Sequence, residues 1–206
     1  MIKNIIFDLG NVIINYDQES ILNKFAKTDA EKQYLIEYNW NAPEWAKNDL
    51  GEIDGNEASA IINQRYNYKY KELTENYWNN WYKYQKINED IVELAKMLKE
   101  KGYQIFVLSN MSNETYNYFK NIDFFKICSG IVISAHEHVK KPDEKIFEIL
   151  LTRYNLKAQE CLFIDDDETN RNYETANKLG ILGRRVKPNN CDDIKKELNE
   201  YIQWEI

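Results

Sequence analysis

The sequence has few cysteines and no long apolar run. Its three cysteines, Cys128, Cys161 and Cys191, lie far apart and show no C-x-x-C spacing. Neither disulfide bonds nor a zinc site is therefore expected. No apolar run approaches the roughly 20 residues that a membrane-spanning helix needs. The first residues, MIKNIIFDLG, lack the long apolar core and the cleavage site of a signal peptide. These absences predict a cytoplasmic protein without a membrane partner.

The sequence also lacks an excess of positive charge. It contains 27 Lys and Arg against 34 Asp and Glu in 206 residues, which gives a formal net charge of −7. Repulsion between this charge and a phosphate backbone or an anionic lipid surface argues against nucleic acid or a membrane as the main partner. A small phosphorylated molecule can still bind where cations are concentrated locally.

Short apolar runs of strand length alternate with helical patterns over most of the chain. The apolar runs are at 2–7, 103–108, 131–134, 161–164 and 181–186. The helical patterns are at 88–101, 143–154 and 169–179, and Gly102 and Gly180 end the first and the last of them. Continuously apolar strands separated by amphipathic helices indicate a parallel sheet that is covered on both faces. The predicted fold class is therefore α/β, with a Rossmann-like parallel sheet flanked by helices.

Residues 17–86 differ from the rest, because they show no clear strand and are crowded with Tyr, Trp, Asn and Lys. The stretch DGNE at 54–57 has the capping-box pattern, which predicts a helix start at Asp54. We interpret 17–86 as a small helical cap inserted after the first strand, and 1–16 with 87–206 as the Rossmann-like core. Its aromatic cluster at 77–84 is expected to pack this helical insert rather than to form a ligand-binding wall.

Polar side chains follow each of the first four predicted core strands. They are Asp8; Ser109 and Asn110; Lys140 and Lys141; and Asp165, Asp166 and Asp167. Parallel strands bring these positions to one edge of the sheet, where ligands bind in doubly wound folds. Two carboxylates, a backbone carbonyl and water suit Mg²⁺, whereas a lysine and a hydroxyl suit a phosphate. Asp8 would then be a nucleophile that forms an acyl-phosphate. Loops commonly carry polar residues, but the ordered set favours a site.

These motifs resemble those of the haloacid dehalogenase (HAD) superfamily of hydrolases. FDLGNV, VLSN, VKKPDEKIF and FIDDDETN occur in that family's order, and the insert lies where the family carries its cap. The FDLGNV form, followed by KP and IDD, is most similar to bacterial sugar-phosphate phosphatases of the alpha-D-glucose-1-phosphate phosphatase type. The resemblance implies Mg²⁺-dependent hydrolysis of a small phosphate monoester, such as glucose 1-phosphate, through an aspartyl-phosphate.

The resemblance also implies a metal site and its supports. Asp8 would be the nucleophile and a magnesium ligand, Gly10 would supply a backbone carbonyl, and Asp166 would be the second carboxylate ligand. Asp165 would support Asp166, and Asn170 falls where an acid that supports the metal ligands often lies.

Phosphate binding is implied at two further motifs. Ser109 would bind the transferring phosphoryl group, with Asn110 beside it. Lys141, directly before Pro142, would pair with Asp8 and the phosphate, and Lys140 is the less favoured of the two lysines.

Gly10 departs from the pattern of most phosphatases of this superfamily. An aspartate usually stands at that position as the general acid and base. Three interpretations remain open: a substrate with an easier leaving group, replacement of the acid by Asp17, or a catalytically impaired phosphate-binding protein. A haloacid dehalogenase and a receiver-like phosphoprotein are the rival classes. The paired acids Asp165 and Asp166 argue against the first, and the helical insert argues against the second.

Overall fold

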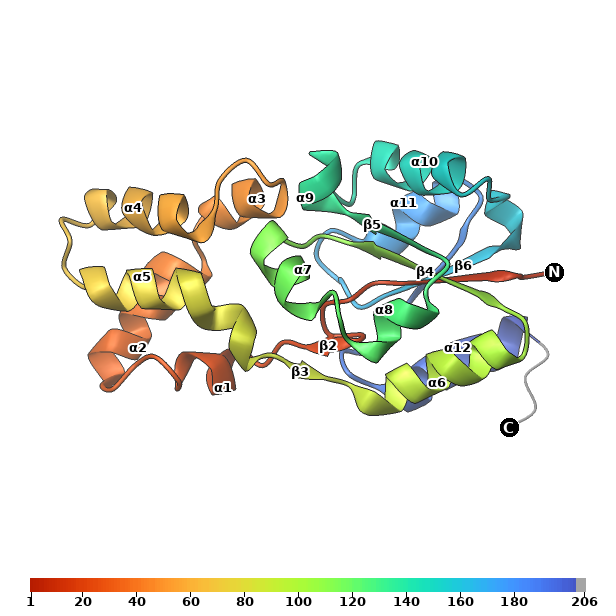
Figure 1. The fold of residues 1–206 in the computed structure, drawn as a ribbon, viewed down its shortest axis with the longest axis horizontal. Helices are drawn as coiled ribbons and strands as arrows, with labels where there is room; N and C mark the ends of the chain where they lie inside the picture. Colours follow the sequence, from red (N-terminus) through yellow and green to blue (C-terminus); the bar gives the residue numbers. More distant parts are fainter. Residues whose placement is uncertain (203–206) are drawn as a thin grey trace.

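The computed structural model describes residues 1–202 and contains a five-stranded parallel sheet with a group of helices beside it (Figure 1). The strand order is β5-β4-β1-β6-β7, so β1 is central. The strands are β1 (Asn4–Phe7), β4 (Gln104–Ser109), β5 (Gly130–Ile133), β6 (Cys161–Asp165) and β7 (Leu182–Arg185). All five predicted strands are present. The predicted α/β class with a parallel sheet is therefore confirmed.

Helices cover both faces of this sheet, as the apolar strands predicted (Figure 1). One face packs against α6 (Glu89–Glu100) and α12 (Cys191–Tyr201), and the other packs against α10 (Glu144–Arg153) and α11 (Asn172–Lys178). Within β1, Ile5 and Phe7 belong to the first hydrophobic cluster and Ile6 to the second. This alternation explains why every residue of the strand is buried.

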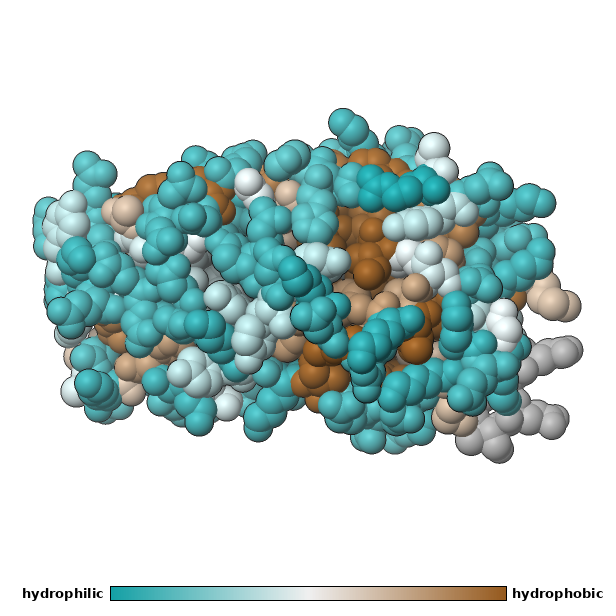
Figure 2. Space-filling view, in the orientation of Figure 1, coloured by the Kyte–Doolittle hydropathy of each residue, from teal (hydrophilic) through white to brown (hydrophobic). Residues whose placement is uncertain are grey.

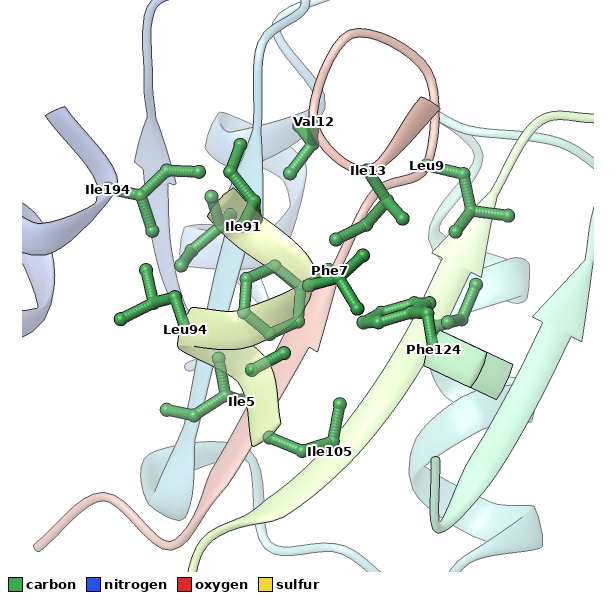
Figure 3. Packing of buried hydrophobic residues seen from close by; sticks show 14 of the residues in the cluster. Ile5, Phe7, Leu9, Val12, Ile13, Ile91, Leu94, Ile105, Phe124 and Ile194 are labelled. Atoms are coloured by element: carbon green, nitrogen blue, oxygen red, sulfur yellow. The ribbon is translucent and has the colours of Figure 1, made fainter. Parts of the chain in front are cut away.

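Aromatic and aliphatic side chains fill the first face of the sheet (Figure 3). Phe7 lies between Ile91 and Leu94 of α6 on one side and Phe124 of α8 (Asp123–Ile127) on the other. The rings of Phe7 and Phe124 meet edge to face, with centroids 6.0 Å apart. Such close packing fixes the end of β1, which is where Asp8 begins the site.

The inserted segment forms short helices around a hydrophobic cluster of its own (Figure 1). They are α1 (Gln18–Leu22), α2 (Asp29–Leu35), a π-helical turn (Ile36–Trp40), α3 (Glu44–Asp49), α4 (Gly55–Arg65), α5 (Lys71–Asn80) and a 3-10 turn (Trp81–Tyr84). Trp45 stacks on Trp78 with ring centroids 4.1 Å apart. The capping box predicted at Asp54 is present, because its side chain accepts from Glu57 N at 2.8 Å.

A two-stranded antiparallel ribbon joins the insert to the core, and it was not predicted from the sequence. It pairs β2 (Ile14–Asn15) with β3 (Lys86–Ile87). A strand of two residues is too short to show the alternation of apolar and polar residues that predicts a strand. The remaining elements are α7 (Asn113–Phe119), α9 (Ser134–Glu137) and a 3-10 turn (Ala158–Glu160). No helix among residues 1–202 is both long and apolar enough to cross a bilayer.

The face of the molecule that Figure 2 shows is mostly hydrophilic. Hydrophobic side chains gather over the region where Figure 1 places β5 and α8. The strand order explains part of this patch, since β5 is an edge strand of the sheet.

Candidate active site

Three carboxylates meet at the carboxyl ends of β1 and β6. The register pairs Phe7 with Ile164, which sets Asp8 beside Asp165. One oxygen from each of Asp8, Asp165 and Asp166 lies within 4.8 Å of the others. Asp8 and Asp165 are buried and Asp166 is half-buried. Such proximity is unfavourable for three ionised groups unless cations offset the repulsion.

Lys141 supplies one of these cations. Its Nζ lies 3.0 Å from Asp8 Oδ1 and 2.6 Å from Asp165 Oδ2, and its side chain is 1% exposed. Burial lowers the pKa of Lys141, but the attraction of Asp165 and Asp8 outweighs burial and raises it above its usual value. The lysine therefore stays charged. Lys140 points elsewhere, with its Nζ 3.8 Å from Asp49 Oδ2.

Asp165 has no free oxygen for a further ligand. In addition to the ion pair with Lys141, it accepts from Asn172 Nδ2 at 3.2 and 3.1 Å and from Asp167 N at 2.8 Å. Its saturated oxygens hold the lysine and the following loop in place.

Asn172 occupies the supporting position that the sequence suggested for Asn170. Asn170 is exposed and its side-chain amide donates to Asp167 Oδ2, away from Asp165. Arg171 between the two asparagines has a left-handed backbone, with φ of 56°. The sequence does not show this left-handed turn, so Asn172 was not predicted to support Asp165.

The charge balance of the cluster fits a divalent cation. Burial, together with repulsion from Asp8 and Asp165, raises the pKa of Asp166 to about 7. Burial also raises the pKa of Asp8 above its ordinary value, although Lys141 opposes the change. Carboxylate oxygens are hard ligands of the kind that Mg²⁺ prefers. Gly10 lines the same cavity as Asp8 and Asp166, so the predicted metal-ligating positions are adjacent in space.

Ser109 and Asn110 lie close to the carboxylates, but Ser109 contacts Asp8 whereas Asn110 contacts the backbone of Lys141. Ser109 is 1% exposed, and its hydrogen bond to Asp8 lowers the pKa of that carboxyl. The Asn110 side chain donates to Lys141 O at 3.0 Å and accepts from Lys141 N at 2.8 Å. The amide thus holds the lysine's backbone, while Asn110 also lines the cavity.

A cavity of about 430 Å³ opens above the carboxylates. The core contributes Asp8, Lys141 and Asp166 to its lining, and the insert contributes Trp45 and Asp49 among others. The lining also includes Tyr16, Trp81, Ser112 and Thr115. The aromatic cluster at 77–84 was expected to pack the insert, and Tyr77 and Trp78 are indeed buried there. Trp81 belongs to the same cluster but also lines the cavity. The sequence alone does not show which of these side chains borders a cavity.

Asp17, the suggested replacement for the acid missing at Gly10, does not line this cavity. It is exposed and caps α1, where its Oδ1 accepts from Ser20 N at 3.2 Å. A Cβ added to Gly10 would meet no atom within 4 Å, so the space that a side chain would enter there is open. Asp49, at the end of α3, does line the cavity and was missed, because nothing in its sequence neighbourhood marks it as different from other helical acids.

Comparisons with known proteins agree with this fold. A D-ribitol-5-phosphate phosphatase from Bacteroides thetaiotaomicron is 26% identical over 221 residues, covering 96% of this chain and 97% of that protein. A glyceraldehyde 3-phosphate phosphatase from Methanopyrus kandleri is 24% identical over 127 residues, covering 57% and 54%. The crystal structure of a HAD family enzyme from Bacteroides thetaiotaomicron, in complex with magnesium and inorganic phosphate, superposes with a TM-score of 0.74 at 24% identity and covers 91% of this chain and 96% of that one.

The family match extends over most of the chain, including the motifs FDLGNV and FIDDDETN that carry the three carboxylates. Residues 2–171 match the haloacid dehalogenase-like hydrolase family. This range contains Asp8, Lys141 and Asp166, together with the whole helical insert. The chain therefore belongs to the haloacid dehalogenase-like hydrolases.

Proposed function

We propose that the chain is a Mg²⁺-dependent phosphatase that hydrolyses a small phosphate monoester through an aspartyl-phosphate on Asp8. The observation that carries this proposal is the placement of Lys141, whose ammonium bridges Asp8 and Asp165 while Asp166 lies beside them at the cavity. A cationic group held next to a nucleophilic carboxylate suits an anionic substrate. Two relatives are phosphatases, of ribitol 5-phosphate and glyceraldehyde 3-phosphate.

Asp8, the Gly10 carbonyl and Asp166 would hold the metal ion. When bound, Mg²⁺ would neutralise phosphate oxygens and relieve the repulsion between the carboxylates. The solved structure of a family member with magnesium and phosphate supports this cofactor.

The residues of the chain then have separate tasks. Asp8 Oδ attacks phosphorus, and the bond to the substrate oxygen breaks. Lys141 stabilises the charge on the phosphoryl oxygens, and its position is fixed by Asp165 and Asn110. Water subsequently hydrolyses the aspartyl-phosphate, which releases inorganic phosphate and restores Asp8.

The substrate class we propose is a small phosphorylated metabolite, for example a sugar phosphate such as glucose 1-phosphate. A cavity of about 430 Å³ accommodates a molecule of this size. We also propose that 17–86 acts as the cap over the core at 1–16 and 87–206. It would exclude water and select the substrate through residues such as Trp45. The cytoplasmic location stays a prediction from the sequence.

A screen of phosphorylated metabolites with Mg²⁺ tests this function. The wild-type chain should release phosphate from at least one sugar or polyol phosphate, and EDTA should stop the release. Asp8→Asn should abolish it while the circular dichroism spectrum and the unfolding midpoint stay close to wild type.

The same assay separates the rival classes. A dehalogenase would release halide from 2-halo acids without metal, and a phosphate-binding protein would bind phosphate in titrations without turning over any ester. Either result, with no Mg²⁺-dependent phosphate release, would refute the proposed function.

A further inference from the structure

The proposed reaction benefits from a proton that Gly10 cannot supply. When the bond between phosphorus and the substrate oxygen breaks, an alkoxide leaves unless it is protonated. General acid–base help of this kind is typically worth about 10²–10⁴-fold. Because Gly10 has no side chain, a donor supplied by the protein has to be another residue of the cavity lining.

Most acids among the described residues of the cavity lining already have another task. Asp8 is the proposed nucleophile and Asp166 a proposed metal ligand. The Asp167 carboxylate accepts from Thr169 N at 2.7 Å and from Asn170 N at 2.9 Å, so it caps its own loop.

The other proton-bearing side chains of the lining are also poorly suited. Glu168 is exposed and pairs with Arg185 at 2.9 Å. Burial raises the pKa of Tyr16 far above its usual value, so its phenol gives up a proton only at high cost. Lys141 is held charged by two carboxylates.

Asp49 remains, and it reaches the cavity from the insert rather than from the core. It ends α3, its side chain is 27% exposed, and it lines the cavity together with Asp8 and Lys141. Lys140 Nζ lies 3.8 Å from its carboxylate, which is long for an ion pair, and Lys141 in the same cavity acts on it more weakly. An acid from the insert and a nucleophile from the core therefore line the same cavity, so both can reach a substrate that is bound between them.

Contacts between the insert and the core hold Asp49 in this place. The Ser134 hydroxyl donates to the Asp49 carbonyl oxygen at 2.5 Å, and His138 Nδ1 lies 2.9 Å from the Leu50 carbonyl oxygen. Gly51 has φ of +66°, and a Cβ there would lie 2.6 Å from the Ala135 carbonyl oxygen. The turn after Asp49 is therefore seated directly on α9 of the core.

The electrostatic surroundings of Asp49 bring its pKa closer to neutral pH. Burial, with a contribution from Asp8, raises the pKa of Asp49 to about 6, although Lys140 opposes the change. A dianionic phosphate beside the carboxyl would raise it further. A catalytic acid works best when its pKa lies near the working pH.

We propose that Asp49 is the general acid and base of this phosphatase, supplied by the cap rather than by the core that carries the nucleophile; the proposal rests on the function proposed above. In the first step, the Asp8–phosphorus bond forms, the bond from phosphorus to the substrate oxygen breaks, and that oxygen takes the proton of Asp49. In the second step, the Asp49 carboxylate takes a proton from water, whose oxygen attacks phosphorus. The Asp8–phosphorus bond then breaks, and phosphate leaves with Asp49 protonated again.

The test compares leaving groups in single-turnover, rapid-quench measurements with Mg²⁺. p-Nitrophenolate leaves without a proton, whereas phenolate benefits from one. Asp49→Asn should therefore slow the first step with phenyl phosphate by about 10²–10⁴-fold and the same step with p-nitrophenyl phosphate by much less. Steady-state turnover of both should fall, because water attack still lacks its base, and one equivalent of p-nitrophenolate should appear in a burst.

Three further variants make the result decisive. Asp49→Ala repeats the test if the Asn variant misfolds. Asp17→Asn examines the rival carboxylate, and Asp29→Asn, on the exposed face of α2, is the matched control that should behave as wild type.

Wild-type rates for Asp49→Asn, equal slowing with both leaving groups, a change in KM alone, or the loss appearing in Asp17→Asn instead would each overturn the role of Asp49 and leave the phosphatase intact. A wild-type chain that hydrolyses no phosphate ester would instead refute the proposed function, and with it this role.

Discussion

Lys141 connects two buried carboxylates, so the charge balance of the site depends on a single side chain. Removing one member of a buried ion pair leaves an uncompensated charge, which typically destabilises a protein by roughly 3–5 kcal/mol. We expect Lys141→Met to abolish turnover and to lower the free energy of unfolding in urea by about this amount at pH 7. Lys140→Met, which removes a partly exposed cation 3.8 Å from its partner, should cost under about 1 kcal/mol. Equal effects of the two variants on stability would contradict the assignment of the buried lysine.

Asp49 should make stability depend on pH in a characteristic direction. Its carboxyl has an ordinary pKa of 3.8 and a pKa of about 6 in the folded chain. Between these values the folded state retains a proton that the unfolded state releases, so the contribution of Asp49 to stability falls as pH rises.

Asp49→Asn should consequently gain stability relative to wild type as pH rises from 4 to 7.5. The upper bound is about 3 kcal/mol, since one pKa unit corresponds to about 1.4 kcal/mol, and partial exposure reduces it. Urea unfolding of both chains at the two pH values measures the difference. A stability difference that is constant or shrinks over this range would show that the carboxyl is not held protonated.

The sequence predicted the placement of those candidate residues that directly follow a strand. Asp8, Ser109 and Asp166 each lie where the tip of a strand puts them. The sequence did not predict Asn172 or Asp49, because their positions depend on a left-handed turn and on the docking of a separate group of helices. Neither the left-handed turn nor the docking of the helices produces a recognisable motif or periodicity in the sequence.

At the scale of elements, the contact of the turn after α3 with α9 holds the side of the cavity that the helical insert contributes. Gly51 and Gly102 both have positive φ, but only at Gly51 would a Cβ meet another segment. Gly51→Ala should therefore displace the turn and lower kcat by at least about tenfold. Gly102→Ala carries the matched backbone strain of about 1 kcal/mol and should keep wild-type kcat.

Kinetics and urea unfolding of these two variants test the contact. Loss of activity in both variants in proportion to their stability would mean that general destabilisation, rather than cap docking, is responsible.

The larger elements were predictable for a simple physical reason. A strand that is buried on both faces is apolar throughout, and the helices that cover it bury one stripe, as Ile91 and Leu94 do in α6. Very short elements leave no such signature. The β2–β3 ribbon, which joins the insert to the core, and α9, which contacts the insert, were therefore not predicted and were found only in the structure.

Across the whole molecule, an acidic chain concentrates three carboxylates in one place. The net charge is −7, and Lys141 is the one cation inside the cluster among residues 1–202, so a divalent cation should bind the folded state far better than the unfolded one. We expect saturating Mg²⁺ to raise the free energy of unfolding by about 2.7 kcal/mol at a concentration 100 times its Kd. Thermal unfolding with and without the ion measures this effect.

Asp166→Asn should lose most of the Mg²⁺-dependent stabilisation. Asp192→Asn, which changes an acid that is 96% exposed, should keep it. If Mg²⁺ stabilised both variants equally against thermal unfolding, the ion would bind at a site other than Asp166.

The central claim is that the carboxylate of Asp8 carries the phosphoryl group during turnover. A trapping experiment tests this directly. The enzyme turns over a substrate with Mg²⁺, is quenched with acid, is reduced with borohydride and is then mapped by mass spectrometry. Borohydride reduces an acyl-phosphate on aspartate to homoserine, which marks the residue that carried the phosphoryl group. We predict homoserine at position 8 in the wild-type chain and none in Asp8→Asn. An enzyme that releases phosphate while residue 8 stays unmodified, or with the modification at another residue, would contradict the account.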